Sequence, residues 1–184
     1  MNASFKIYHS KIKNIFMKAV KFFTLAFALL LSVSVFAQDS KTLPSVELKT
    51  LEGQPINLQE LGQKGHPVLI SFWATWCSPC KKELDAVADY YEDWQDEYNL
   101  EIVAITIDNQ RALAKVKPMV ATKGWDYTIL SDANGGCQQA MNFQSVPQTF
   151  LLNAAGEIVY SHTGYVPGDE EELEEQIEMA AKGK

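Results

Sequence analysis

The chain has 184 residues, which is enough for one domain with a substantial core and too few for two ordinary domains. Its composition is globular, with 47% hydrophobic and 21% charged residues and without repeats or low-complexity runs. The formal net charge is -7 and the basic residues do not cluster on any predicted domain face, which argues against nucleic-acid binding.

The first segment, residues 1–37, has the three-part pattern of a secretory signal peptide. It contains five lysines and no acidic residue, and an apolar run then extends from Phe22 to Phe36. Val35 and Ala37 stand three and one residues before Gln38, as small side chains do at a signal peptidase site. The apolar run is shorter than the ~20 residues that cross a bilayer as a helix. We therefore expect an exported, periplasmic protein that loses this leader.

The leader has one alternative interpretation and one alternative start. Residues 17–37 can stay in place as a membrane anchor, and Met17 can be the true start because a basic segment follows it directly. In either case we expect residues 38–184 to form a single folded domain. That domain is strongly acidic without the leader's lysines, which argues against binding to an anionic membrane surface. Disulfides persist outside the cytoplasm, so a cysteine pair there is either structural or catalytic.

Along the mature chain, strands are predicted to alternate with helices. Residues 46–49 and 55–58 have extended patterns on either side of a Glu-Gly turn, which indicates an N-terminal hairpin. Residues 67–73 are almost entirely apolar, as in a strand buried on both faces, and a helix is predicted from Cys77 to about Tyr98. The remaining predicted elements are a strand at 102–107, a helix at 111–123, a strand at 127–130, a short helix at 135–142, a hairpin at 149–152 and 158–162, and a last helix from about Asp169. This order indicates an α/β fold with a central mixed β-sheet flanked by helices.

The strongest functional signal is the segment Trp76-Cys77-Ser78-Pro79-Cys80, which stands where a buried strand gives way to a helix. Cys77 falls at the helix N-terminus, where the helix dipole and free backbone N–H groups stabilise a thiolate. The thiolate is the form that attacks a disulfide, and Cys80, one turn further along, can resolve the resulting mixed disulfide. We therefore expect Cys77 and Cys80 to be catalytic and to form a redox-active disulfide.

Two other interpretations of the cysteine pair are half of a zinc site and a structural disulfide. A zinc site needs two more ligands, and the sequence has neither a second Cys-x-x-Cys nor a His pair. A structural bridge that closes so short a loop adds little stability. The redox interpretation is therefore favoured, and we expect no metal and no cofactor.

The segment from Phe72 to Glu83, Phe-Trp-Ala-Thr-Trp-Cys-Ser-Pro-Cys-Lys-Lys-Glu, resembles the active site of the thioredoxin superfamily. It is most similar to the exported TlpA/ResA-like branch. A second matching motif runs from Val146 to Phe150, and the resemblance covers most of residues 43–181. It implies a thioredoxin-like fold with an extra N-terminal β-hairpin, and a protein-disulfide reductase that works by dithiol–disulfide exchange.

In this family the proline of the second motif is cis and faces the cysteine pair. The resemblance therefore implies a cis bond before Pro147, which places the backbone of Val146 beside Cys77. An extended substrate can pair with that backbone as an added strand. Trp76 is expected at the rim of the site, in contact with the substrate. The alternative is a proline that merely begins a strand.

Glu83 is the third element of the expected site. Cytoplasmic thioredoxins carry a buried Asp in the strand before the motif, and the corresponding residue here is Ser71. The TlpA/ResA-like branch resembles this chain in having an acid three residues after the second cysteine. That spacing puts Glu83 on the same helix face as Cys80, where a partly buried carboxylate can accept the Cys80 proton. The alternative is a surface Glu paired with a lysine.

Two further residues with reactive side chains have ordinary structural interpretations. Cys137 shares a predicted helix face with Ala140 and Met141, so we expect a buried structural thiol; a regulatory or intermolecular partner is the alternative. His162 lies on a predicted strand, where a lone histidine is more often a plain strand residue than a ligand.

The favoured function is reduction of disulfides in exported proteins, for which cytochrome c maturation is a frequent context in the resembling family. The expected partners are exported protein thiols and disulfides and a membrane or periplasmic electron donor. We expect a monomer, because the sequence does not indicate the dimer that a disulfide isomerase usually requires.

Two other functions are alternatives. One is a peroxiredoxin-like peroxide reductase, although that group has a Thr three residues before its cysteine, whereas Thr75 stands two residues before Cys77. The other is a copper-carrying chaperone that uses Cys77, Cys80 and His162, although such chaperones on this fold have a wider cysteine spacing.

Overall fold

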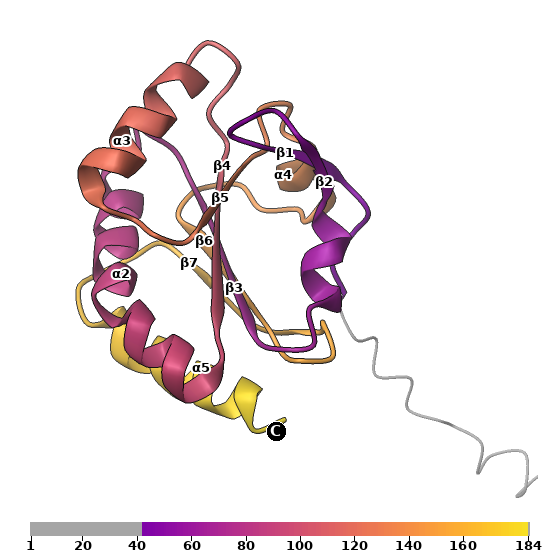
Figure 1. Cartoon of the computed structure of the whole chain (residues 1–184), viewed down its shortest axis with the longest axis vertical. Helices are drawn as coiled ribbons and strands as arrows, with labels where there is room; N and C mark the ends of the chain where they lie inside the picture. Colours follow the sequence, from indigo (N-terminus) through magenta and orange to yellow (C-terminus); the bar gives the residue numbers. More distant parts are fainter. Residues whose placement is uncertain (1–41, 184) are drawn as a thin grey trace, which may run out of the picture. The chain divides into compact units, whose positions relative to one another are not determined.

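The computed structural model describes residues 42–183 (Figure 1). The signal peptide and the membrane anchor are both interpretations of residues that lie outside this range. Between Thr42 and Gly183, no helix combines the length and the apolar character needed to cross a bilayer.

The described residues form a seven-stranded sheet whose order is β2-β1-β5-β4-β3-β6-β7. The strands are β1 (Glu47–Thr50), β2 (Pro55–Asn57), β3 (Val68–Trp73), β4 (Glu101–Thr106), β5 (Thr128–Ser131), β6 (Gln148–Leu152) and β7 (Ile158–Thr163). The α-helices are α2 (Ser78–Tyr98), α3 (Val116–Lys123), α4 (Gly136–Ala140) and α5 (Asp169–Ala181), and two 3-10 helices are η1 (Leu58–Gln63) and η2 (Leu113–Lys115).

The sheet is mixed, as the sequence predicts. β3, β4 and β5 run parallel to one another, whereas β6 pairs antiparallel with β3, and β1 pairs antiparallel with β5. The N-terminal hairpin is also confirmed, because β1 and β2 pair antiparallel with Leu48 opposite Ile56. Parallel neighbours end at the same edge of a sheet, so the segments that follow β3, β4 and β5 meet there. The cysteine pair belongs to the first of these segments.

Alternate residues of β3 face two separate cores. Leu69 and Trp73 pack against α2 and α5 on one face of the sheet, and Val68, Ile70 and Phe72 pack on the other face with η1 and α4. All six residues of β3 are buried, as the continuous apolar run indicates. Ser71 is the polar exception: it is buried and, by the alternation of a strand, lies on the α2 face.

α2 positions the cysteine pair because both of its ends are well defined. Its N-cap is Cys77, and Pro79 occupies the first turn, where a missing N–H costs nothing. Its last residue is Tyr98, after which Asn99 takes a left-handed conformation with φ 53° and ends the helix. The buried apolar stripe of α2 contains Leu84, Val87 and Trp94, and Tyr91 at the same helical spacing is partly buried.

Two segments differ from what the sequence pattern indicates. The helix predicted at 111–123 begins as the 3-10 turn η2, and α3 itself starts only at Val116. The reason is Asn109, whose side chain accepts hydrogen bonds from the backbone N–H groups of Arg111 and Ala112. The segment after β2, which has the glycines of a loop, forms η1, with Asn57 and Glu60 making a reciprocal capping box.

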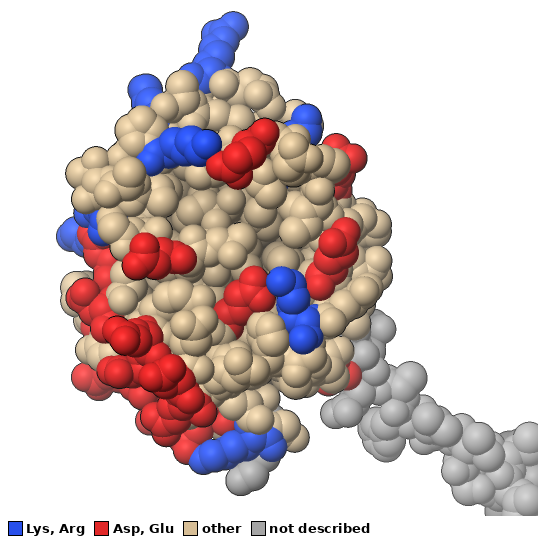
Figure 2. All heavy atoms as spheres, in the orientation of Figure 1, with Lys and Arg blue, Asp and Glu red and all other residues tan. Residues whose placement is uncertain are grey.

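Acidic side chains concentrate over the helical layer formed by α2 and α5 (Figure 2). The first turn of α5 carries four carboxylates, which suits the positive end of its dipole. The exposed acidic residues of α2 are Asp89, Glu92, Asp93, Asp96 and Glu97. This surface is a solvated face whose charge keeps the domain soluble.

Candidate active site

The two cysteines are joined by a disulfide at the carboxyl end of β3, with Cα atoms 5.4 Å apart. Cys77 caps α2: its Sγ accepts a hydrogen bond from the backbone N–H of Cys80 at 3.2 Å. Cys77 is the more exposed residue of the pair, with 4% of its surface accessible against 0% for Cys80. A nucleophilic sulfur at position 77 therefore has a backbone donor directed at it and is the nearer of the two to solvent.

The loop that carries the cysteines is held by Asp108, a buried residue just beyond β4. Its carboxylate accepts hydrogen bonds from the backbone N–H of Thr75 at 2.7 Å and from the Thr75 hydroxyl at 2.8 Å. The Thr106 hydroxyl donates to the same carboxylate at 2.7 Å, and Lys81 Nζ donates to the Thr75 carbonyl at 3.0 Å. The backbone two residues before Cys77 is therefore fixed from both sides.

Asp108 is a site residue that the sequence reasoning missed. The available signal is its position, since a polar residue that directly follows a buried parallel strand stands at the edge where such sites form. Its contact with Thr75 also bears on the peroxide-reductase alternative. The Thr75 hydroxyl is engaged by Asp108 and not by the cysteine pair.

The bond between Val146 and Pro147 is cis, and it lies against the cysteine pair. The carbonyl oxygen of Val146 is 3.6 Å from the Sγ of Cys77. On its other side, the carbonyl of Pro147 accepts a hydrogen bond from Gly164 at 2.9 Å, which ties this turn to the end of β7. Trp76 stands beside Cys77 in the chain and is 68% exposed, so a large apolar side chain adjoins the disulfide.

Glu83 lies in the interior and not on the surface beside a lysine. It is 5% exposed, and its carboxyl group is bracketed by two hydroxyls from neighbouring strands. Ser71 of β3 donates to Oε2 at 3.4 Å, and Thr149 of β6 donates to Oε1. Ser71 and Thr149 are register partners in the sheet, so the carboxyl group sits over one cross-strand pair.

Burial raises the pKa of Glu83 from 4.5 to about 7. Loss of hydration is the largest cause, because a carboxylate is far better solvated by water than by this core. The hydrogen bonds from Thr149 and Ser71 act in the opposite direction, and the negative charge of Asp169 adds to the rise. The group therefore gains and loses its proton near neutral pH, which is the range that a proton acceptor needs.

The other two residues singled out from the sequence make no contact with the cysteine pair. Cys137 is a buried free thiol, as expected, and burial raises its pKa. His162 Nε2 lies 3.4 Å from Oδ2 of Asp169. Among residues 42–183 no group of three or more His, Cys, Asp or Glu side chains is arranged to hold a metal ion, so the copper alternative has no preformed site there.

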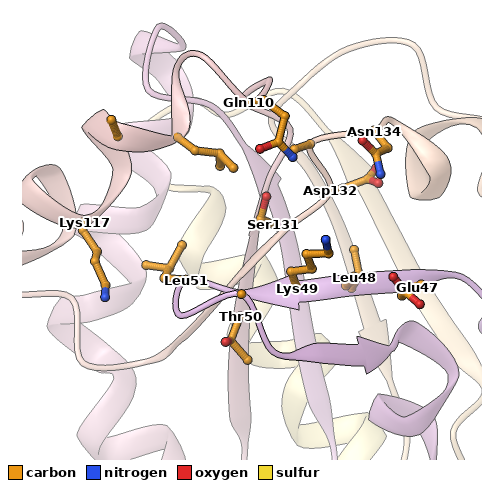
Figure 3. Close-up of a pocket in the computed structure, with 14 residues that line it drawn as sticks. Glu47, Leu48, Lys49, Thr50, Leu51, Gln110, Lys117, Ser131, Asp132 and Asn134 are labelled. Carbon is orange, nitrogen blue, oxygen red and sulfur yellow. The ribbon is translucent and has the colours of Figure 1, made fainter.

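A separate cleft of about 460 Å³ opens between β1 and the η2–α3 segment (Figure 3). Its walls include Lys49 and Lys117 as well as Glu47 and Asp132, so its charge is mixed. The cleft contains no cysteine and shares no residue with the surroundings of Glu83. It is therefore separate from the redox site.

Residues 40–161 match the AhpC/TSA family. The chain belongs to this family. The thioredoxin-like protein YneN of Bacillus subtilis is 31% identical over 143 residues, which span 77% of this chain and 80% of that relative. The thiol-disulfide oxidoreductase ResA of Halalkalibacterium halodurans is 34% identical over 72% of this chain and 71% of its own length.

The solved structures agree with this assignment. An uncharacterized thioredoxin-like protein from Porphyromonas gingivalis is 42% identical, with a TM-score of 0.69, over 76% of this chain and 92% of that chain. The predicted thioredoxin-like fold is thereby confirmed. Within the AhpC/TSA family, the protein is a thiol–disulfide oxidoreductase of the ResA type.

The first prediction concerns Asp108. Replacing it with Ala removes the acceptor for three buried donors, so Asp108→Ala should lower the free energy of unfolding by roughly 3 kcal/mol. The matched control is Asp126→Ala, because Asp126 is exposed. Urea denaturation of both variants gives the comparison, and equal stabilities would contradict the role assigned to Asp108.

The second prediction concerns the pH dependence of stability. Folding raises the pKa of Glu83, so the folded protein binds this proton more tightly than the unfolded chain does. The stabilisation that results is complete below about pH 4.5 and is lost as the pH rises through about 7. Relative to Glu83→Gln, the oxidised wild-type protein should lose roughly 3 kcal/mol of unfolding free energy across that window. Urea titrations at several pH values measure the difference. A pH-independent difference would mean that the carboxyl group does not titrate there.

Proposed function

We propose that the protein reduces disulfides of exported proteins by dithiol–disulfide exchange through Cys77 and Cys80. The single observation that carries the proposal is the placement of a buried carboxyl group, Glu83, three residues beyond a cysteine pair at a helix N-terminus. A structural disulfide has no use for a costly interior carboxylate, whereas a redox pair that must gain and lose protons does.

In the first step, the Cys77 thiolate attacks one sulfur of the substrate disulfide. A bond forms between Cys77 and that sulfur, and the other substrate sulfur leaves as a thiolate. The backbone N–H of Cys80, which is directed at Cys77 Sγ, favours the thiolate form. The outer position of Cys77 gives the incoming disulfide access to it.

The substrate is held by backbone contacts beside the pair. Because the Val146 carbonyl lies 3.6 Å from Cys77 Sγ, an extended substrate segment that reaches Cys77 can also pair with the backbone of Val146. The exposed ring of Trp76 offers an apolar contact to the same segment. Recognition of this kind depends little on substrate sequence, which suits an enzyme with several protein substrates.

In the second step, Cys80 gives its proton to the Glu83 carboxylate and attacks the Cys77 sulfur. The Cys77–Cys80 bond forms, the bond between Cys77 and the substrate breaks, and the substrate sulfur that Cys77 held leaves as a thiolate. Two electrons have then passed from the cysteine pair to the substrate. An external dithiol, the membrane or periplasmic electron donor expected from the sequence, returns them by the reverse exchange.

The cellular setting is part of the same proposal. The basic and apolar leader of residues 1–37 supports export to the periplasm, either with cleavage before Gln38 or with residues 17–37 kept as an anchor. Residues 38–184 then act there as a monomeric thioredoxin-like domain. Maturation of cytochrome c, a frequent context in the resembling family, is one setting that would use such a reductase.

The third prediction separates the two chemical steps. Glu83→Gln should slow resolution of the Cys77 mixed disulfide by roughly 10- to 100-fold and leave attack by Cys77 little changed, because only the second step uses the carboxylate as a proton acceptor. Rapid quenching with an alkylating agent, followed by intact-mass analysis, measures accumulation of the mixed disulfide. The matched control is Glu92→Gln, an exposed substitution on the same helix.

Two results would count against the proposal. Faster alkylation of Cys80 than of Cys77 in the reduced protein would reverse the assignment of nucleophile and resolving cysteine. A redox midpoint nearer to about -120 mV than to about -270 mV, measured against glutathione and dithiothreitol, would make the protein an oxidant of its substrates.

A further inference from the structure

The buried carboxyl group of Glu83 needs a route by which its proton reaches solvent. Cys80 is fully buried, and a substrate joined to Cys77 covers the outer side of the pair during the step in which the proton is released. The hydroxyls of Ser71 and Thr149 occupy the sheet side of the carboxyl group. An exit must therefore lead away from the cysteine pair.

A row of polar side chains leads from Glu83 to the edge of the sheet. Ser71 of β3 pairs with Thr149 of β6, and Thr149 pairs with His162 of β7. Directly paired residues place their side chains on the same face, so all three lie on the face covered by α2 and α5. β7 is an edge strand of the sheet, and His162 has 37% of its side chain exposed. The row thus runs from the interior to solvent.

A small cavity joins the two ends of this row. It has a volume of about 20 Å³, and its walls include Glu83, Thr149, His162 and Asp169. That volume holds about one water molecule. Most of the lining is apolar, so the water's hydrogen-bond partners would be the polar atoms of Glu83, Thr149 and His162. Asp169, at the start of α5, also lies within 3.4 Å of the imidazole and so orients it.

We propose that His162, oriented by Asp169, relays the proton between the buried Glu83 carboxyl group and solvent through this cavity. The inference rests on the proposed function, because it extends the proton path of the resolving step. Once Glu83 has taken the Cys80 proton, it passes a proton through one water to His162, and His162 releases a proton to bulk water. No electron moves in these transfers, and Glu83 returns to the carboxylate form for the next cycle.

The charged and titratable surroundings of Glu83 are compatible with such a relay. Histidine is the residue type whose ordinary titration range lies nearest to neutral pH, which matches a carboxyl group whose pKa is about 7. The negative charge of Asp169 raises the pKa of Glu83, and the same carboxylate lies 3.4 Å from the imidazole of His162. The other titratable groups that line the cavity or interact electrostatically with Glu83 are Tyr160 on β7, Tyr127 before β5, Tyr165 between β7 and α5, and Glu170 in the first turn of α5.

The test replaces the imidazole and then returns it from solution. His162→Ala should slow resolution of the Cys77 mixed disulfide by about 10-fold at neutral pH, the low end for a positioned acid–base group, and added imidazole should restore the rate. His162→Gln, which retains a polar side chain but cannot carry a proton, should show the same slowing. The matched control is His66→Ala, since His66 contacts Glu101 outside this cavity and should leave the rate unchanged.

The outcomes distinguish failure of the His162 relay from failure of the proposed function. If Glu83→Gln slows resolution and His162→Ala does not, the relay is wrong and the proposed function stands. If His162→Ala slows resolution but neither imidazole nor more concentrated buffer restores the rate, His162 has a structural role and the relay is again wrong. If Glu83→Gln has no effect on resolution, Glu83 is not the proton acceptor, and that part of the proposed function is wrong whatever the result for His162→Ala.

Discussion

The carboxyl group of Glu83 is buried between α2 and the sheet, where Ser71 and Thr149 supply its hydrogen bonds. Placing an ionisable group in an apolar core costs free energy, and two neutral hydroxyls offset only part of that cost. The remainder appears as a pKa raised to about 7. Three elements therefore meet at this carboxyl group: α2, which carries the cysteines, β3, which precedes them, and β6, which follows Pro147. The group can be charged or neutral near pH 7.

This arrangement places a buried carboxyl group beside β3 although β3 itself carries no acid. Position 71, where cytoplasmic thioredoxins carry a buried Asp, holds a serine, and the carboxyl group that the serine binds comes from α2 instead. The acid thus reaches the same strand position from the helix. An acid on the helix that carries Cys80 keeps a fixed spacing of three residues from that cysteine. In the proposed mechanism, proton acceptance and thiolate attack are therefore tied to one rigid element.

Much of the fold and the centre of the site follow from local patterns. The apolar run of β3, the Cys-x-x-Cys pair at the start of α2 and the hairpins at both ends are recognisable from a few consecutive residues each. The contacts of Asp108 with Thr75 and of Thr149 with Glu83 are different, since they join residues far apart in the chain. Such contacts depend on strand order and register, which periodicity does not determine. His162 likewise becomes informative only once β7 is known to pair with β6 beside Thr149.

The most direct test of this account is an NMR titration of the Glu83 side-chain carboxyl carbon in the oxidised protein, assigned by its disappearance in Glu83→Gln. Burial between α2 and the sheet predicts a midpoint of about 7. A midpoint near the ordinary value of 4.5 would mean that the carboxylate is well solvated, and it would contradict the central role given to its burial.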